Sequence, residues 1–225
     1  MGCVTLGTRQ IATGVIVPEQ EMIINMTERK HPFSSIEVTR LFKEFSQAGL
    51  VNKVAYSVFY EWCLSIEVDT NTLKDKYSRY IDLISLPDSE IDVHLLLVTG
   101  ILLAKGSFFN KILKLIKIYS KNVLVLTKDG IMTMLVDLIY VSTMILPALS
   151  KEAIKEDLYH QYIKRIKCCE RVFVEKFMRL FEGPDLVSQT AFLKVFEDNK
   201  ELQKICWPNG VRMLLIEEQL VDSYG

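Results

Sequence analysis

The sequence predicts an all-α protein of four helix–loop–helix units in two pairs, joined by short β-bridges. Apolar residues recur with helical spacing along most of the 225 residues. Glycine and proline are sparse, at 10 and 6 residues, which favours long uninterrupted helices. Each of four helical patterns runs into a short break, and one aliphatic residue then precedes the next pattern. These aliphatic residues, expected to pair between neighbouring loops, are Val51, Ile91, Leu126 and Val187.

The N-terminal segment, residues 1–31, combines scattered apolar residues with Pro18, which predicts an irregular arm with a short turn of helix. The ordered body is expected to begin next. Ser34 followed by Glu37 has the spacing of a capping signal, so the first helix should start here. It should end at Gly49.

The later units are predicted from helix-capping residues that follow each break. Asp92, Thr127 and Ser188 can each accept a hydrogen bond from the first turn of the next helix. The chain then divides into four parts: the arm at 1–31, a first pair of units at 32–106, a second pair at 107–200 and a tail at 201–225.

Composition excludes several classes of protein. The net charge of −1 at pH 7 offers no electrostatic basis for binding nucleic acid. The five cysteines are odd in number and fit no disulfide framework, so a reducing cytoplasm is expected. The first residues lack the basic segment and sustained apolar core of a secretory signal.

Residues 131–149 are apolar and nearly long enough to span a bilayer. Asp137 lies near the middle of this segment and Pro147 near its end. An Asp at the centre of a membrane span costs about 2.5–3.5 kcal/mol. We therefore expect a buried helix of a soluble domain.

Three stretches of the chain resemble the EF-hand proteins of the neuronal calcium sensor, calcineurin B-like and calaxin type. The first is FSSIEVTRLFKEFSQAGLVNKVAYSVF. The second runs from IDVHLLLVTG through VLVLTKDGIMTML, and the third is FVEKFMRLFEGPDLVSQTAFLKVFEDNKELQKI. The likeness covers roughly residues 33–207. It implies four helix–loop–helix units and an apolar groove that takes an amphipathic helix of a protein target.

The chain departs from that family at its metal ligands. A calcium loop needs a bidentate Glu four residues after the pairing aliphatic residue. The positions of this closing Glu are occupied by Ala55, Leu95, Gly130 and Ala191. The second loop retains Asp88 and Asp92, which supply too few oxygens. We therefore expect no metal and no other cofactor, and a residual calcium sensor is the weakest alternative.

The resemblance favours a calcium-independent regulatory or adaptor subunit. The alternative is a structural subunit of a ciliary, axonemal or cytoskeletal assembly, as the likeness to calaxin suggests. The groove residues that we expect to bind a partner helix are apolar and lie on the four units: Phe42, Phe59, Trp62, Leu97, Ile101, Ile112, Ile116, Met134 and Leu138.

The first residues resemble those of acylated members of the family. Gly2 is placed for myristate and Cys3 for palmitate, but the motif requires Ser or Thr where the chain has Leu6. One acyl chain alone binds membranes only marginally, so Cys3 would have to carry the second. The expected location is the cytoplasm, with a membrane surface or a cilium as alternatives.

Nothing in the sequence favours catalysis. The three histidines, His31, His94 and His160, are far apart in sequence. No Ser-His-Asp order, phosphate-binding glycine loop or metal-spaced Cys/His set is present. We therefore expect a protein that is not an enzyme.

Overall fold

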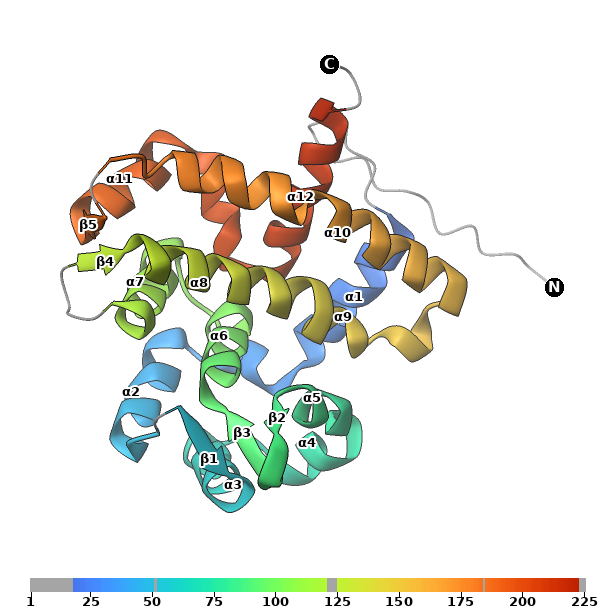
Figure 1. Ribbon diagram of the computed structural model, residues 1–225. Coiled ribbons are helices and arrows are strands. Elements are labelled where there is room, and N and C mark those ends of the chain that lie inside the picture. The colour runs from blue at the N-terminus through green and yellow to red at the C-terminus, as the bar shows by residue number, and fades with distance from the viewer. Residues whose placement is uncertain (1–17, 51, 121–124, 184, 223–225) are drawn as a thin grey trace.

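The computed structural model describes residues 18–50, 52–120, 125–183 and 185–222, with side chains described through Glu217. The fold is mostly helical, at 78%, with twelve α-helices and short two- and three-stranded antiparallel sheets in the described part of the chain. The predicted all-helical class is thus confirmed. Figure 1 shows two halves, with α2 to α5 in one and α8 to α12 in the other. Helix α1 lies with the second half, beside α9 and α10.

The described residues from 18 to 103 form short elements joined by tight connections. In chain order they are α1 (Glu19–Lys30), a 3-10 turn η1 (Pro32–Ser35), α2 (Val38–Ala48), β1 (Lys53–Ala55), α3 (Tyr56–Ser65), α4 (Thr70–Lys76), α5 (Ser78–Leu83), β2 (Ser85–Leu86), η2 (Pro87–Ser89), β3 (Glu90–Asp92) and α6 (Val93–Leu103).

The C-terminal half contains the longest helices. Its elements are α7 (Phe108–Tyr119), β4 (Val125–Thr127), α8 (Lys128–Tyr140), a π-helical turn η3 (Val141–Ile145), α9 (Leu146–Ala148), η4 (Lys151–Ala153), α10 (Glu156–Arg179), β5 (Leu186–Ser188), α11 (Gln189–Asp198), η5 (Lys200–Cys206) and α12 (Pro208–Asp222).

The strands pair the loops much as the sequence predicts. In the two-stranded sheet, Leu126 lies opposite Val187. In the three-stranded sheet, of order β1-β3-β2, Ile91 lies opposite Val54. The predicted residue Val51 lies outside the described residues, and Val54 occupies the position expected for it. The pairing residue thus lies three residues later than predicted, and the position four residues after it is Val58 rather than the predicted Ala55.

Three of the helices that follow the strands begin with the predicted side-chain caps. The side chains of Asp92, Thr127 and Ser188 accept hydrogen bonds from backbone N–H groups at distances of 3.0, 3.0 and 3.1 Å. Each cap satisfies a backbone donor that the first helical turn leaves unpaired. The N–H groups belong to three residues at the predicted closing positions: Leu95, Gly130 and Ala191.

Two predictions near the N-terminus are wrong. The predicted irregular arm contains α1, a full helix. Its buried residues are Glu21, Ile24 and Glu28, and because two of these are charged, the sequence shows no apolar face here. The next α-helix starts at Val38 rather than at the predicted cap, Ser34. The Ser34 hydroxyl instead donates to the carbonyl oxygens of two earlier residues, and the segment before α2 forms a bridge to the end of α6.

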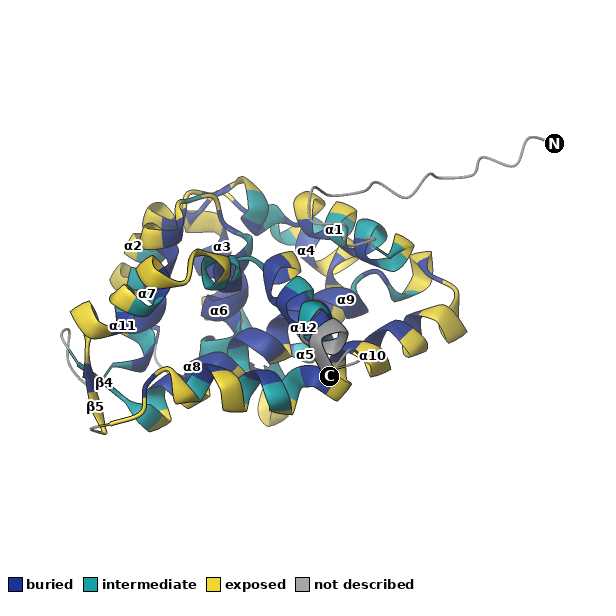
Figure 2. Ribbon diagram, turned by 90° about the horizontal axis from the view of Figure 1, so that it is seen from above, coloured by how far each residue is buried: buried dark blue, intermediate teal, exposed yellow. Residues whose placement is uncertain are grey.

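Apolar side chains from both halves form one core, and α6 and much of α12 lie at its centre (Figure 2). Residues 201–225 were predicted as a tail segment, but α12 packs against α10, α8 and η3 and buries Val211, Leu214, Leu215 and Ile216. Lys128–Ala148 is, within the described residues, the one helix long and apolar enough to cross a membrane. Because 67% of its apolar window is buried, it serves as a core helix here.

Candidate interaction site

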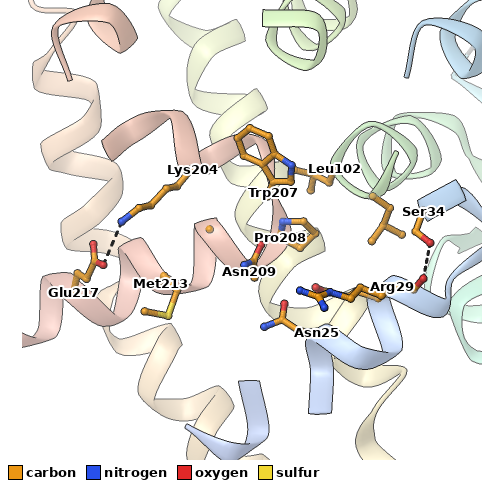
Figure 3. Close-up of a pocket in the computed structure, with 13 residues that line it drawn as sticks. Asn25, Arg29, Ser34, Leu102, Lys204, Trp207, Pro208, Asn209, Met213 and Glu217 are labelled. Carbon is orange, nitrogen blue, oxygen red and sulfur yellow. Dashed lines mark hydrogen bonds and ion pairs between the residues drawn. The ribbon is translucent and has the colours of Figure 1, made fainter. Parts of the chain in front are cut away.

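A cavity of about 530 Å³ lies among α1, the end of α6, η5 and the start of α12. We call it the α1–α12 cavity (Figure 3). Its apolar wall consists of Leu102, Leu103, Trp207, Pro208 and Met213, and its remaining lining consists of Asn25, Glu28, Arg29, Ser34, Lys204, Asn209, Gly210 and Glu217. Ligand pockets typically measure about 300–1,000 Å³ and combine an apolar wall with a few polar groups, so this cavity has the size and lining of a binding site.

The turn between η5 and α12 shapes one wall of the cavity. Pro208 occupies the first position of α12, where the missing N–H costs no helical hydrogen bond. A Cβ atom on Gly210 would lie 2.1 Å from the carbonyl oxygen of Lys204, so the close approach of η5 to α12 requires glycine here. Trp207, Pro208 and Gly210 thus form the wall together.

The charged groups at the cavity edge differ in how far they are paired. Lys204 contacts the carboxylates of Glu201 and, at 3.5 Å, Glu217. The exposed Arg29 guanidinium has no ion pair or side-chain hydrogen bond with the described residues. Figure 3 shows the Arg29 side chain extending toward Pro208 and Asn209. Arg29 is therefore the cation at this edge that remains available to an acidic group of a ligand.

A buried ion cluster lies behind the cavity and joins the first helix to the last. The fully buried Arg212 of α12 donates from Nε and Nη2 to the two carboxylate oxygens of Glu21, each at 2.8 Å. Its Nη1 donates to Glu28 at 2.7 Å. Bidentate arginine–carboxylate pairs are among the strongest charge-assisted hydrogen bonds. The cluster therefore fixes α1 against α12, and with them two sides of the cavity.

The π-helical turn supplies a further partner to Arg212. The Leu146 N–H donates to the carbonyl of Val141, five residues earlier. The next donor in that pattern would be the N–H of residue 147, but this residue is proline and has none. The Ser142 carbonyl instead accepts from Nη1 of Arg212 at 2.9 Å. The hydrogen-bonding defect in the helix thus becomes part of the ion cluster.

Burial and charge have opposite effects on the cluster. Burial opposes the charge of Arg212, but the carboxylates of Glu21 and Glu28 raise the pKa of this guanidinium well above its ordinary value. Burial raises the pKa of Glu28, and Arg212 counters part of that shift. The arginine is therefore charged at every physiological pH. The Tyr162 hydroxyl completes the cluster by donating to Glu21.

A buried lysine joins the end of α6 to η5 beside the cavity. Lys111 Nζ donates to the carbonyl oxygens of Leu102, at 2.7 Å, and Cys206, at 3.2 Å. The same ammonium lies 5.0 Å from the centroid of the Trp207 ring, within the range of a cation–π contact. Burial lowers the pKa of Lys111 to about 8. This side chain therefore positions Trp207 and Leu102 in the cavity wall.

The groove residues predicted from the sequence do not line an open surface. Eight of the nine are buried in the core: Phe59, Trp62, Leu97, Ile101, Ile112, Ile116, Met134 and Leu138. Only Phe42 is half-buried, with Lys114 Nζ 5.1 Å from its ring centroid. The prediction of an open groove at these positions is corrected, because an apolar helical position has the same appearance in a core and in a groove.

The cavity and the ion cluster behind it were not predicted from the sequence. The available signal was Arg212 inside the apolar run VRMLLI, next to the turn Trp207–Gly210. A charged residue within a buried helical face needs a partner. The partners lie in a segment that was predicted to be an irregular arm.

The described part of the chain contains no group of three or more His, Cys, Asp or Glu side chains that could hold a metal ion. Asp88 is exposed, and Asp92 is occupied as a helix cap. Of the histidines, His31 is buried among aromatic rings. The predicted acylation residues, Gly2 and Cys3, lie outside the described residues.

No protein-family model, curated protein or solved structure matches this chain.

Proposed function

We propose that this protein is a non-catalytic, calcium-independent adaptor built from four degenerate EF-hand units. One observation carries the proposal: two pairs of loops are joined by aliphatic residues in register, and none of the four has a closing carboxylate. The residues four places after the pairing positions are Val58, Leu95, Gly130 and Ala191. Without a bidentate Glu there, such a loop cannot enclose Ca²⁺.

The packing of α12 supports a protein whose helices keep a single arrangement. A calcium sensor exposes an apolar groove when metal binding changes the angle between its helices. Here α12 lies against α8, η3 and α10, and Arg212 anchors it through Glu21 and Glu28. Displacing α12 would leave three buried charges without partners, which is costly. The chain's own last helix therefore serves as a permanent internal occupant.

The α1–α12 cavity is the surface on which we place the partner. An amphipathic helix of a protein target would insert an apolar side chain between Leu103, Trp207 and Met213. A carboxylate one or two turns further along that helix would pair with Arg29. The kind of partner is the one predicted from the sequence, an amphipathic helix. Only its binding site differs, because the predicted groove residues are buried.

The proposal is tested first by calcium titration. We expect isothermal titration calorimetry to show no binding of Ca²⁺ at micromolar concentrations, because no loop supplies a closing carboxylate. Binding of a purified partner should be the same with calcium and with a chelator. A micromolar calcium affinity would contradict the proposal.

The site is tested separately by substitution. Met213→Glu places a charge in the cavity wall and should weaken binding of the partner recovered with the wild-type protein at least tenfold. Leu64→Glu is the matched control, since Leu64 is 61% exposed on α3 and lies outside the cavity. Equal affinity of the two variants would remove the cavity from the proposal, while leaving the calcium result intact.

A further inference from the structure

A stripe of partly exposed apolar side chains runs along α8 and into η3. Met132, Val136 and Tyr140 are 37, 48 and 41% exposed, and Met144 is half-buried. Their spacing of four residues places them along one face of the helix. Apolar side chains scattered singly over a surface need no explanation, but a continuous helical stripe indicates an interaction surface.

Three members of the stripe, Val136, Tyr140 and Met144, form one side of a groove with α10. The groove has a volume of about 480 Å³, and Val174 contributes to its apolar floor. Helices α8 and α10 run antiparallel along one side of the molecule (Figure 1). Their register is set where the Thr143 hydroxyl hydrogen-bonds Glu170 at 3.0 Å. This α8–α10 groove is lined by none of the residues that line the α1–α12 cavity.

The charges on the α10 side of the groove are balanced and ordered. Lys167, Glu170, Arg171 and Glu175 line it, so their formal charges cancel. A rim with no net charge does not by itself attract nucleic acid or an anionic membrane. Along the helix, Lys167 and Glu175 are equally distant from Arg171, one on each side. A pattern of this kind is complementary to itself when the helix is reversed.

We infer that a second copy of this chain covers the α8–α10 groove in a symmetric dimer. A two-fold axis near Arg171 would place α10 antiparallel to α10 of the second copy, so that Lys167 of each faces Glu175 of the other. The stripe on α8 would then meet its own counterpart. Arg171 lies nearest the axis, and its charge is already countered by its own Glu175 at 2.8 Å.

The size of the groove face fits such a dimer. Helices of 21 and 24 residues are about 30–36 Å long, and packed side by side they present about 600 Å² on each copy. Specific interfaces bury about 800 Å² on each partner, and weaker ones bury less. A face of this size is at the small end for a specific interface, so the dimer is sought at about micromolar concentrations.

The inference is tested by sedimentation velocity on the full chain at about 1 to 100 μM, because an interface of this size dissociates at such concentrations. The wild type should dimerise. Lys167→Glu and Glu175→Lys should each weaken the dimer at least tenfold, because each places like charges opposite one another. The double variant with both changes should dimerise as the wild type does. An equimolar mixture of the two single variants should form a heterodimer, because their charges are complementary again.

Controls separate the interface from the fold. The changed side chains are exposed, and circular dichroism and unfolding midpoints should confirm that each variant is folded. Lys194→Glu, on the exposed side of α11, is the matched charge reversal and should leave the dimer unchanged. The inference would be overturned if the wild type stays monomeric up to about 100 μM, a concentration at which even a weak specific interface forms. It would also be overturned by single variants whose association is not restored by the double change or by mixing.

Discussion

Two buried polar centres adjoin α1: one is charged and the other is neutral. In the second half of the molecule, Arg212 is fully buried and ionised, with Glu21 and Glu28 as partners. In the first half, His31 directly follows α1 and is equally buried. It packs against the rings of Phe33, Tyr77 and Tyr80.

The two centres are equally buried and differ in their hydrogen-bond partners. Four of the five N–H donors of Arg212 reach oxygen atoms of described residues. His31 Nδ1 accepts from the N–H of Phe33 at 3.3 Å, but Nε2 has no hydrogen-bond partner in the described structure. Burial therefore lowers the pKa of His31 to about 3 and keeps the ring neutral. A buried side chain stays ionised only where groups of opposite charge or hydrogen-bond acceptors and donors are buried beside it.

The largest expected effect comes from breaking the charged centre. Arg212→Met should lower the free energy of unfolding by about 3–5 kcal/mol, because two carboxylates remain buried without a cation. Urea denaturation followed by circular dichroism measures this difference. The cooperativity of unfolding should be retained, since the apolar core is unchanged.

Two variants sharpen this result. Arg40→Met removes an exposed pair, Arg40–Glu67 at 2.9 Å, and should leave the free energy of unfolding nearly unchanged, because water and salt screen exposed ion pairs. Adding Glu21→Gln and Glu28→Gln to Arg212→Met should recover part of the loss, because the uncompensated charges are gone. If Arg212→Met costs no more than Arg40→Met, the cluster does not fasten α1 to α12.

The neutral centre should be visible as a pH dependence. The pKa of His31 is about 3 in the folded protein and about 6.5 in the unfolded chain, so the unfolded chain binds the proton first as pH falls. The contribution is fully present above pH 6.5 and is lost below it. Between pH 7 and pH 5 the free energy of unfolding should fall by about 2 kcal/mol. Urea denaturation at the two pH values measures the change.

His31→Gln should remove this part of the pH dependence, whatever it does to stability at pH 7. His160→Gln is the matched control, because His160 lies on the surface of α10, 3.6 Å from Glu156. It should leave the loss between pH 7 and pH 5 nearly unchanged. The assignment to His31 fails if the two substitutions have the same effect.

The features of the fold that could be predicted from the sequence are local ones. The pairing of Leu126 with Val187 and the caps at Asp92, Thr127 and Ser188 follow from local rules of spacing and helix termination, and the structure has them. Val51 and Val54 satisfy the same rule in the first unit, so the sequence alone could not choose between them.

The missed features depend on contacts between distant parts of the chain. The inner face of α1 carries Glu21 and Glu28, which look like a solvated face until Arg212, 191 and 184 residues away in sequence, is placed against them. The same limit applies to the predicted groove. Phe59 and Met134 are apolar at helical positions whether a partner or the chain's own helices cover them, and here they are fully buried.

The smallest expected effect concerns the hydroxyl that completes the charged centre. Tyr162 donates to Oε2 of Glu21, the same oxygen that accepts from Nε of Arg212 at 2.8 Å. Tyr162→Phe leaves that carboxylate still paired with Arg212, so it should cost about 1.5 kcal/mol, the low end for a hydrogen bond to a charged group. Urea denaturation measures the loss, and Tyr140→Phe, at an exposed ring, should stay within about 0.5 kcal/mol of the wild type. A loss as large as that of Arg212→Met would mean that the hydroxyl, rather than the ion pair, keeps Glu21 stable in the core.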